Sequence, residues 1–385
     1  MPGSQPRHGP WGRNVAVDSS PPVVGVLGGG QLGRMLGLAG IPLGVTFRFL
    51  DPAPDASASV AGALRVASLR DADAAVALAD GATVVTYEWE GVPADTARAA
   101  GEHAPLRPGS RALEAAQDRL AEKQLLARLG VPVPRFAPVD SRADLDTALG
   151  DVGLPAVLKT RRGGYDGKGQ RLLRGGADVD PAWQALGDAP LLLEELVPFD
   201  RELSIIGVRG LDGTVARYPL VETKHRGGVL RVARAPAPAT AERVDAEAES
   251  IVRRLLDELD YVGVVTVELF DHGGRLLANE FAPRVHNSGH WTIEGAVTSQ
   301  FENHLRAVLG WPLGSTAARG ESGMVNALGT LPDRASVLEV EGAHLHEYGK
   351  AAQPGRKVGH VTVVADTAAG RDRQLEAVCR VVEPR

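Results

Sequence analysis

Cysteine, lysine and aromatic residues are scarce in this chain of 385 residues. Only 4% of the residues are aromatic, and the one cysteine, Cys379, cannot form an internal disulfide. A chain without internal disulfides fits a reducing compartment, so we expect a cytoplasmic protein. No apolar run approaches the roughly 18–20 residues of a membrane span. No basic run accompanies the net charge of −6, so we expect neither a nucleic-acid partner nor a membrane partner.

Lysine is the rarer of the two strong cations. Of the 42 lysines and arginines only six are lysine. Lysine offers a compact, flexible ammonium where arginine offers a planar fork, so a lysine kept in such an arginine-rich chain is a candidate for a binding site. The six are Lys123, Lys159, Lys168, Lys224, Lys350 and Lys357.

The length predicts two or three domains with ample chain for a core. We expect residues 1–20 to form a disordered tail, since they have no apolar centre of the kind a secretory signal needs. Apolar runs at 23–27, 45–50 and 83–89 alternate with helical stretches, which predicts an open parallel sheet over residues 21–105. A single helix is expected over 111–129, ending at Gly130.

The pattern changes after residue 130. Strands are expected at 155–160, 191–196, 202–209 and 215–222, followed by a helix over 241–260 and an exposed loop at 233–241. The runs 264–270 and 275–281 flank Asp-His-Gly-Gly, a hairpin pattern. Helix is expected at 297–309, three strands within 324–366 and a short helix at 371–381.

A glycine motif follows the first expected strand. Gly28, Gly30 and Gly33 have the spacing of a turn that holds a phosphate at a helix N-terminus. Asp51 ends the next strand, where a dinucleotide fold carries its ribose-binding acid. The motif alone leaves open a nicotinamide-binding protein.

A second glycine-rich segment, KTRRGGYDGKGQ, begins at Lys159. Such a loop can close over a nucleotide and present N–H donors and cations to its phosphates, although its spacing is not that of a P-loop. A plain glycine-rich turn is the simpler alternative. The run Glu194-Glu195-Leu196-Val197 with Glu202 could offer backbone groups to adenine and a carboxylate to ribose, or could be a surface acidic cluster.

Two carboxylates mark the expected hairpin. If the turn is His272-Gly273-Gly274, Glu268 faces Ala278 and has Glu280 as its diagonal neighbour, about 7–8 Å away. Carboxylates so placed repel each other unless a cation such as Mg²⁺ lies between them. A charged hairpin with a polar turn is the alternative.

Two polar loops complete the candidate sites. Arg284, His286, Asn287 and His290 follow the hairpin closely. Near the end of the chain, Lys350, Arg356 and Lys357 alternate with glycines, which suits a small anion or a solvated basic loop.

Taken in order, these segments resemble one family. GGGQLGRM, TYEWE, DRLAEK, KTRRGGYDGKGQ, YPLVETKH, VELF with NEFAPRVHNSGHW, and YGK with PGRKVGH occur between about Val23 and Asp366. The chain resembles the ATP- and bicarbonate-dependent carboxyaminoimidazole ribonucleotide synthases of purine biosynthesis, which are ATP-grasp enzymes.

The resemblance implies a fold and a reaction. It implies a mixed α/β and α+β chain with a Rossmann-like N-terminal domain (21–108), a helix with a small lid (109–192) and a C-terminal ATP-grasp domain (193–385). It implies a homodimer that uses ATP and Mg²⁺ to phosphorylate bicarbonate to carboxyphosphate. The amine of aminoimidazole ribonucleotide is then carboxylated, with release of ADP and phosphate. Another ATP-grasp carboxylase or a ribonucleotide transformylase is the alternative.

The resemblance also assigns residues by their place in the motifs. The implied nucleotide-binding residues are Arg119, Lys123, Lys159, Gly164, Gly167, Lys168, Gly169, Gln170, Glu194, Glu195, Leu196, Val197, Glu202, His225, Asn279 and Glu280. The implied metal ligands are Glu268 and Glu280. The implied ribonucleotide contacts are Gln31, Glu88, Tyr165, Asp166, Lys350 and Arg356, and the implied bicarbonate contacts are Arg284, His286 and Asn287. One departure is local: Trp89 and Gly91 stand where the family commonly has Phe and Asn.

Overall fold

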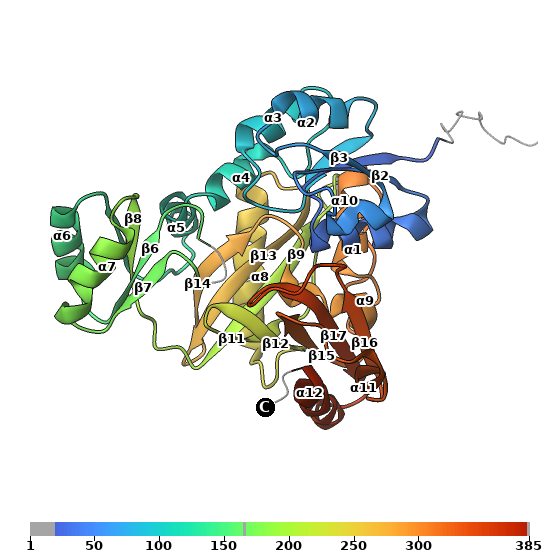
Figure 1. Ribbon diagram of the computed structural model, residues 1–385. Coiled ribbons are helices and arrows are strands. Elements are labelled where there is room, and N and C mark those ends of the chain that lie inside the picture. The colour runs from blue at the N-terminus through green and yellow to red at the C-terminus, as the bar shows by residue number, and fades with distance from the viewer. Residues whose placement is uncertain (1–19, 165–166, 383–385) are drawn as a thin grey trace, which may run out of the picture.

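The computed structural model describes residues 20–164 and 167–382. The expected tail over residues 1–19 and two expected substrate contacts, Tyr165 and Asp166, lie outside the described residues. The described chain forms three β-sheets (Figure 1). No helix among the described residues is both long and apolar enough to span a bilayer.

The N-terminal sheet is open and parallel, with strand order β3-β2-β1-β4. Its strands are β1 (Val23–Leu27), β2 (Thr46–Asp51), β3 (Ala63–Val66) and β4 (Val84–Tyr87). Its helices are α1 (Gln31–Gly40), α2 (Ala72–Ala79) and α3 (Ala94–Gly101), with short 3₁₀ turns η1 (Ile41–Leu43) and η2 (Ser57–Ala61). The parallel sheet expected over 21–105 is confirmed, and its carboxyl edge holds Gly28, Asp51 and Glu88 next to one another.

The second sheet is a small antiparallel one of order β5-β8-β6-β7. Figure 1 shows it with its two helices as a separate lobe at the left. Its strands are β5 (Phe136–Val139), β6 (Ala156–Thr160), β7 (Gln170–Leu173) and β8 (Leu191–Glu195), and its helices are α6 (Arg142–Val152) and α7 (Val179–Leu186). Leu145, Leu158 and Leu193 lie in the core between these layers.

The third sheet has nine antiparallel strands of order β14-β13-β9-β11-β12-β15-β17-β16, with β10 beside β9. The strands are β9 (Arg201–Arg209), β10 (Val215–Arg217), β11 (Val221–Arg226), β12 (Val229–Ala235), β13 (Gly263–His272), β14 (Arg275–Ala282), β15 (Glu321–Leu328), β16 (Ala343–Glu347) and β17 (Lys357–Ala365). The helices are α8 (Glu242–Glu258), α9 (Thr292–Gly295), α10 (Gln300–Leu309), α11 (Arg334–Leu338) and α12 (Ala368–Val382), with the 3₁₀ turn η4 (Asn287–Gly289).

Several expected elements differ in their limits. The helix expected over 111–129 is two helices, α4 (Ser110–Ala116) and α5 (Arg119–Arg128). Asp118 causes the break, because its carboxylate accepts from the backbone N–H groups of Leu120 and Ala121 and caps the second helix. The helix expected from 297 begins at Gln300, where Ser299 caps it.

Two expectations about the middle of the chain are wrong. The strand expected over 215–222 is divided between β10 and β11, with Pro219 in the gap. The loop expected to be exposed over 233–241 begins inside β12, and Ala233, Ala235 and Ala237 are buried. Alanine is small enough to pack tightly in a sheet, so composition alone indicated a loop where the structure has a buried strand end.

Candidate active site

One buried carboxylate joins two of the expected nucleotide lysines. Glu194, near the end of β8, accepts from Lys123 Nζ of α5 and from Lys159 Nζ of β6, each at 2.7 Å. Glu194 and Lys123 are each 2% exposed. Burial opposes ionisation of Glu194, but the two ammonium groups outweigh it and lower its pKa to about 2. The group therefore carries a net positive charge between two sheets.

Helix α5 also fixes strand β14. Lys123 Nζ donates to the backbone carbonyl of Asn279 at 2.6 Å, and Glu122 accepts from the backbone N–H of Phe281 at 2.6 Å. Burial and the nearby charge of Glu280 raise the pKa of Glu122 to about 8. Glu122 was missed by the sequence analysis, although it directly precedes an expected site lysine and faces the same strand.

The register of the hairpin corrects the sequence prediction. The turn has two residues, Gly273 and Gly274, with φ of 59° and 76°, so His272 pairs with Arg275. Both central residues need positive φ, which glycine adopts freely. A register shift after Glu268 then brings Glu268 directly opposite Glu280. The two carboxylates are thus direct cross-strand neighbours, closer than the expected diagonal pair.

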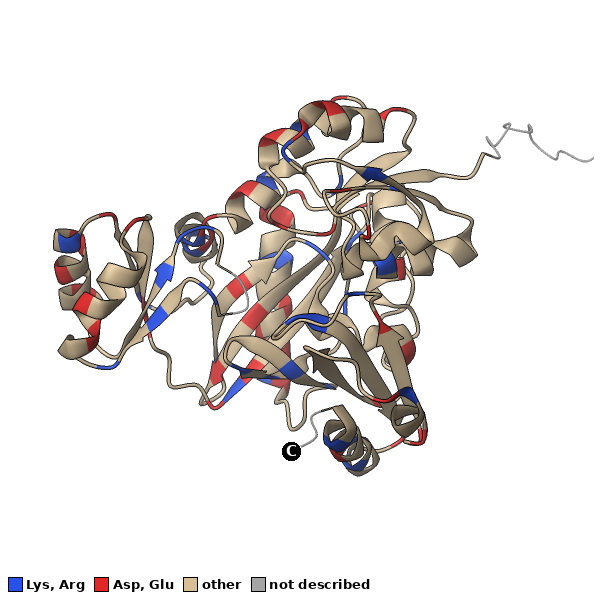
Figure 2. Cartoon of the chain, in the orientation of Figure 1, with Lys and Arg blue, Asp and Glu red and all other residues tan. Residues whose placement is uncertain are grey.

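This carboxylate pair fits a hard divalent cation. Burial and the neighbouring Glu280 raise the pKa of Glu268 to about 7, as expected where two acids share a site without a counter-ion. The described residues hold no cluster of three or more His, Cys, Asp or Glu. Mg²⁺ commonly takes only one or two protein carboxylates and completes its shell with water and phosphate oxygens, so the pair suits it. Acidic residues mark β13 and β14 in the middle of the molecule, and basic residues mark the small sheet opposite (Figure 2).

The expected adenine and ribose residues divide into two groups. Glu202 on β9 accepts from His225 Nδ1 at 2.9 Å, and this bond raises the pKa of His225 against the opposing effect of burial. Val197 is buried close by in sequence. Glu195 instead binds Arg135 Nε at 3.0 Å, because successive strand residues point to opposite faces. Glu195 therefore does not join the group around Glu194, and Leu196 uses its N–H on the Pro155 carbonyl.

The glycine-rich loop lies between α5 and the third sheet. Arg119 Nη2 donates to the Gly164 carbonyl at 3.1 Å, and the Gly169 carbonyl accepts from the Thr160 N–H at 2.8 Å. Gly167 approaches the Gly227 carbonyl so closely that a side chain at 167 would collide with it. Gln170 pairs with Lys159 where the loop returns to β7, and Lys168 belongs to the same loop.

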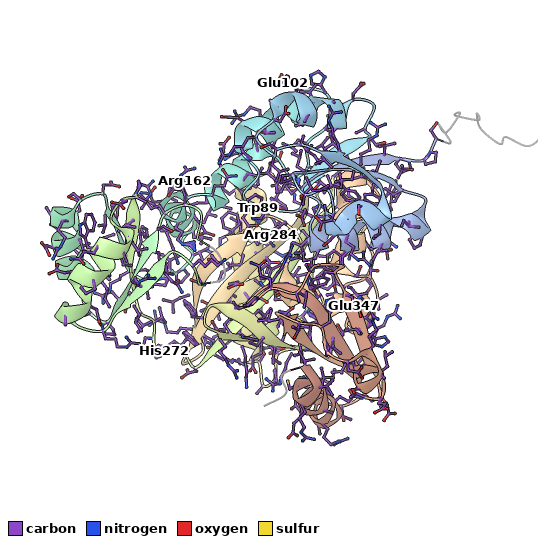
Figure 3. All side chains as sticks on the ribbon, in the orientation of Figure 1. Trp89, Glu102, Arg162, His272, Arg284 and Glu347 are labelled. Carbon is purple, nitrogen blue, oxygen red and sulfur yellow. The ribbon has the colours of Figure 1, made fainter. Side chains whose placement is uncertain are left out.

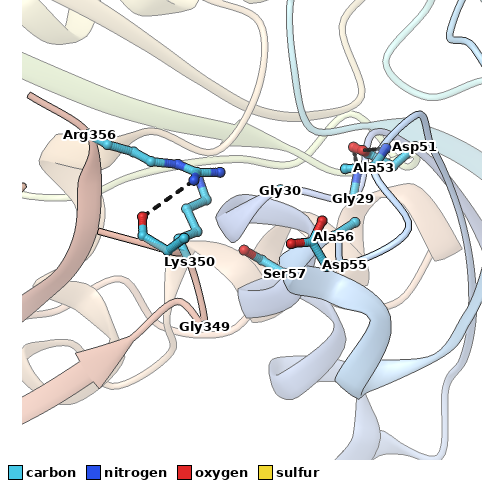
Figure 4. A pocket seen from close by; sticks show the side chains of 11 residues that line it. Gly29, Gly30, Asp51, Ala53, Asp55, Ala56, Ser57, Gly349, Lys350 and Arg356 are labelled. Atoms are coloured by element: carbon cyan, nitrogen blue, oxygen red, sulfur yellow. Dashed lines mark hydrogen bonds between the residues drawn. The ribbon is translucent and has the colours of Figure 1, made fainter. Parts of the chain in front are cut away.

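The N-terminal sheet meets the C-terminal residues at a cavity of about 210 Å³ (Figure 4). Lys350 and Arg356 lie on one side, and Lys350 Nζ donates to Gln31 Oε1. The lining residues are Gly29, Gly30, Asp51, Ala53, Asp55, Ala56, Ser57, Gly349, Lys350, Ala351 and Arg356.

Two carboxylates shape the glycine turn beside the cavity. Glu88 accepts from the N–H groups of Gly30 and Gly33 at 3.1 Å each, and burial raises its pKa. Asp51 accepts from the N–H groups of Gly29 and Ala53. Both oxygens of Asp51 are thus engaged by backbone N–H groups, which counts against the ribose-binding role of the nicotinamide alternative.

The loop after the hairpin is fixed by groups from distant elements. Arg284 Nε donates to Glu90, while Asn287 exchanges amide hydrogen bonds with Asn326 on β15. His286 Nε2 lies 3.4 Å from Glu268 Oε1. The structure therefore brings Arg284, His286 and Asn287 to the end of the hairpin that carries Glu268 and Glu280.

His286 is held in one orientation. Its Nδ1 accepts from the Ser288 N–H at 3.3 Å and lies 2.9 Å from Ser288 Oγ, which in turn contacts Ser204. Gln300 brackets the backbone N–H and carbonyl of His286. Burial and the charge of Arg284 lower the pKa of His286 well below its usual value, so the ring is neutral. Ser288 lies in the NEFAPRVHNSGHW motif but was not assigned a role. Ser204, Gln300 and Asn326 lie in no quoted motif, because only the fold brings them here.

Trp89 and Gly91 are in direct contact. The indole lies across the backbone of Gly91, where a Cβ would collide with the ring, and Trp89 is 45% exposed. Gln117 Nε2 donates to the carbonyls of Glu90 and Val92 and holds this turn. Figure 3 places Trp89 near Arg284 at the centre of the molecule. The two departures from the family motif therefore depend on each other.

Three family models match consecutive parts of the chain. The ribonucleotide synthetase preATP-grasp domain matches residues 22–117, the ATP-grasp domain residues 124–301, and the phosphoribosylaminoimidazole carboxylase C-terminal domain residues 322–374. An N5-carboxyaminoimidazole ribonucleotide synthase of Pseudomonas aeruginosa is 52% identical over 354 residues, which are 92% of this chain and 98% of that protein. The chain belongs to the N5-carboxyaminoimidazole ribonucleotide synthase family.

Solved structures of this family have the same fold. The synthetase of Thermus thermophilus superposes with a TM-score of 0.90 at 55% identity, covering 94% of this chain and 99% of that one. The Aspergillus clavatus synthase in complex with ADP and 5-aminoimidazole ribonucleotide superposes with a TM-score of 0.89 at 32% identity, covering 95% and 99%. The expected ATP-grasp fold is confirmed, and the chain is an ATP-grasp ligase of the family.

Proposed function

We propose that this chain uses ATP and bicarbonate to carboxylate the amine of aminoimidazole ribonucleotide, releasing ADP and phosphate. One observation carries the proposal: the charge of Arg284 interacts with both Glu88, which organises the glycine turn, and Glu280, and His286 Nε2 lies 3.4 Å from Glu268 Oε1. A bicarbonate held there would touch both a nucleotide site and a ribonucleotide site. The complex of the Aspergillus clavatus relative with ADP and 5-aminoimidazole ribonucleotide supports both ligands.

The nucleotide residues have separate tasks in this proposal. Arg119, Lys123 and Lys159 neutralise ATP phosphates, and the loop from Gly164 through Gly167, Lys168 and Gly169 to Gln170 covers them. Glu194 holds the two lysines and is fully engaged by them. Leu196, Val197, Glu202, His225 and Asn279 are assigned to adenine and ribose. Glu268 and Glu280 would hold Mg²⁺, which when bound neutralises phosphate charge during phosphoryl transfer.

The chemistry needs positioning and charge more than covalent help. A bicarbonate oxygen attacks the γ-phosphorus of ATP, the bond to the β–γ bridging oxygen breaks, and ADP leaves. The amine nitrogen then attacks the carbon of carboxyphosphate. The bond between this carbon and the oxygen that bridges it to phosphorus breaks, phosphate leaves, and the amine loses a proton. Arg284 is suited to holding both anions, because its ion pair with Glu90 keeps its pKa raised despite burial. Carboxyphosphate hydrolyses readily, which is a reason for a covering loop that excludes water.

His286 has an orienting role in this mechanism. Because Nδ1 accepts from Ser288, the neutral ring carries its proton on Nε2, which faces Glu268. The imidazole therefore donates a hydrogen bond. The ribonucleotide is assigned to Gln31 and Glu88, with its phosphate at Lys350 and Arg356. Tyr165 and Asp166 remain proposed contacts on the motif alone.

The proposal extends to the organisation of the protein. The family resemblance supports three domains (21–108, 109–192 and 193–385) and a homodimer. The single cysteine supports a cytoplasmic location. Analytical ultracentrifugation at micromolar concentration tests the dimer directly.

ADP release tests the proposed reaction. The purified chain should release ADP from ATP only when bicarbonate and aminoimidazole ribonucleotide are both present, and Glu280→Gln should abolish the release. Formate or biotin should not replace the two substrates. ATP turnover that ignores the ribonucleotide would contradict the substrate assignment.

A further inference from the structure

Ser57 carries a buried hydroxyl without a hydrogen-bond partner among the described residues. The residue is 6% exposed, and its Oγ accepts and donates no bond within the described chain. Buried hydroxyls in folded proteins are nearly always satisfied, because an unsatisfied one loses its bonds to water and gains none in return. A bound ligand that accepts a hydrogen bond from Ser57 Oγ would satisfy this hydroxyl.

Ser57 belongs to the wall of the cavity. Ser57 lines the same cavity of about 210 Å³ as Lys350 and Arg356, which lie across it (Figure 4). Asp55 also lines this space, and the two oxygens of Asp51 accept from the backbone N–H groups of Gly29 and Ala53. A neutral O–H donor facing two cations suits an anion with several acceptor oxygens.

The position of Ser57 is fixed by its backbone. Its carbonyl accepts from Arg34 Nη1 at 3.4 Å, and the next residue, Ala58, donates its N–H to the Gly29 carbonyl at 2.9 Å. Turn η2 is thus attached to α1 and to the glycine turn of the cavity. A hydroxyl on a rigid support loses little entropy when it meets a ligand.

We propose that Ser57 donates a hydrogen bond to the 5′-phosphate of the ribonucleotide, as a third phosphate ligand beside Lys350 and Arg356. This assignment rests on the proposed function for the identity of the ligand. The phosphate is the part of the ribonucleotide that needs several donors and two cations at once.

Ser57→Ala separates a binding role from a structural one. Because the hydroxyl has no partner within the described chain, its removal should leave the thermal unfolding midpoint unchanged or raise it. The KM for aminoimidazole ribonucleotide should rise about 10- to 100-fold, as for the loss of one hydrogen bond to a charged group, while kcat and the KM for ATP stay the same. Ser59→Ala, an exposed serine of the same turn, is the matched control and should change none of these. Ser57→Asp should weaken ribonucleotide binding far more, because it sets a negative charge against the phosphate.

A binding measurement keeps this test independent of the reaction. Ribose 5-phosphate should raise the unfolding midpoint of the wild-type chain and of Ser59→Ala, and raise that of Ser57→Ala less. Should ADP release prove independent of the ribonucleotide, the proposed reaction fails, yet this ribose 5-phosphate shift still reports on Ser57. An unchanged KM together with an unchanged ribose 5-phosphate shift in Ser57→Ala overturns the proposal. A lowered midpoint without a change in binding also overturns it, since Ser57 would then be structural.

Discussion

At the scale of single residues, the buried ammonium of Lys123 has three hydrogen-bond acceptors around it. Its ammonium donates to Glu194 Oε1 and to the carbonyls of Ala278 and Asn279. A planar guanidinium is larger and cannot direct its donors to three such points around one atom. The presence of lysine rather than arginine at position 123 thus has a physical reason.

Lys159→Arg should impair turnover although it conserves charge. Lys159 shares the carboxylate of Glu194 with Lys123, and a guanidinium there would displace one of the two ammonium groups. We expect at least a 10-fold loss in kcat/KM for ATP in the ADP-release assay. Lys224→Arg, at an exposed position of β11, is the control and should keep wild-type activity. Equal activity of the two variants would contradict a special role for lysine at 159.

Gly91→Asn should destabilise the chain, because a side chain at position 91 collides with the indole of Trp89. We expect a loss of about 1–3 kcal/mol in the free energy of unfolding, typical of overpacking. The double variant Trp89→Phe with Gly91→Asn should recover most of that loss, and a double-mutant cycle of denaturant unfolding measures the coupling. Additive effects of the two changes would contradict the contact.

At the scale of elements, the hairpin β13–β14 illustrates what a sequence can and cannot predict. The two runs and the Gly-Gly turn indicate a hairpin, and both carboxylates were placed on one face. Their direct pairing depends on a two-residue turn and on a register shift after Glu268, and neither follows from alternation of residues. The break at Asp118 is similar: the helical pattern continues through it, and only the cap divides the helix.

Glu268→Gln should reduce the stabilisation that Mg²⁺ and ADP give together. The wild-type chain should gain about 2.7 kcal/mol when the complex is present at 100 times its Kd. The variant should gain much less, because one of the two facing carboxylates is gone. Differential scanning calorimetry with and without Mg²⁺ measures this gain, with Glu242→Gln, at an exposed site on α8, as control. An equal gain in all three proteins would place the cation elsewhere.

At the scale of the whole molecule, a buried histidine connects two sheets. His304 of α10 contacts Thr86 Oγ1 of β4 at 2.9 Å through Nε2 and accepts from the Val264 N–H of β13 through Nδ1. Burial lowers its pKa to about 4. The neutral ring is therefore part of the contact between the N-terminal sheet and the large sheet.

Acid should weaken this connection. A histidine with a pKa near 6.5 when unfolded and about 4 when folded contributes stability that is complete above pH 6.5 and is lost as the pH falls to about 4. The contribution is about 3 kcal/mol. His304→Gln should make unfolding less dependent on pH in this window, while the exposed His103→Gln should not. Buried His286, His290 and His360 share the remaining acid dependence. Identical pH profiles for both variants would contradict the assignment to His304.

The class of fold could be predicted from the sequence because it is carried by local motifs, and the same motifs nominate the candidate site residues. Asn326, 39 residues away from its partner Asn287, lies in no such motif. Glu90 lies in TYEWE, but its partner Arg284 is 194 residues away, so no local pattern predicts that pair. The pair of Glu90 and Arg284 forms only when the first and third sheets come together, and the pair of Asn287 and Asn326 forms when η4 packs against β15. Glu195 was assigned to the nucleotide site because the run that contains it could offer backbone groups to adenine, and strand alternation directs its side chain to the face opposite Glu194.

The proposed reaction depends on the activation of bicarbonate by phosphorylation in the space between Arg284 and the facing carboxylates Glu268 and Glu280. Turnover in ¹⁸O-labelled bicarbonate tests it most directly, because the oxygen that attacks the γ-phosphorus stays with phosphate when the carbon is transferred. We expect one ¹⁸O atom in each inorganic phosphate released, measured by the isotope shift in ³¹P NMR, and equal amounts of phosphate and carboxylated product. Unlabelled phosphate formed alongside carboxylated product would contradict it.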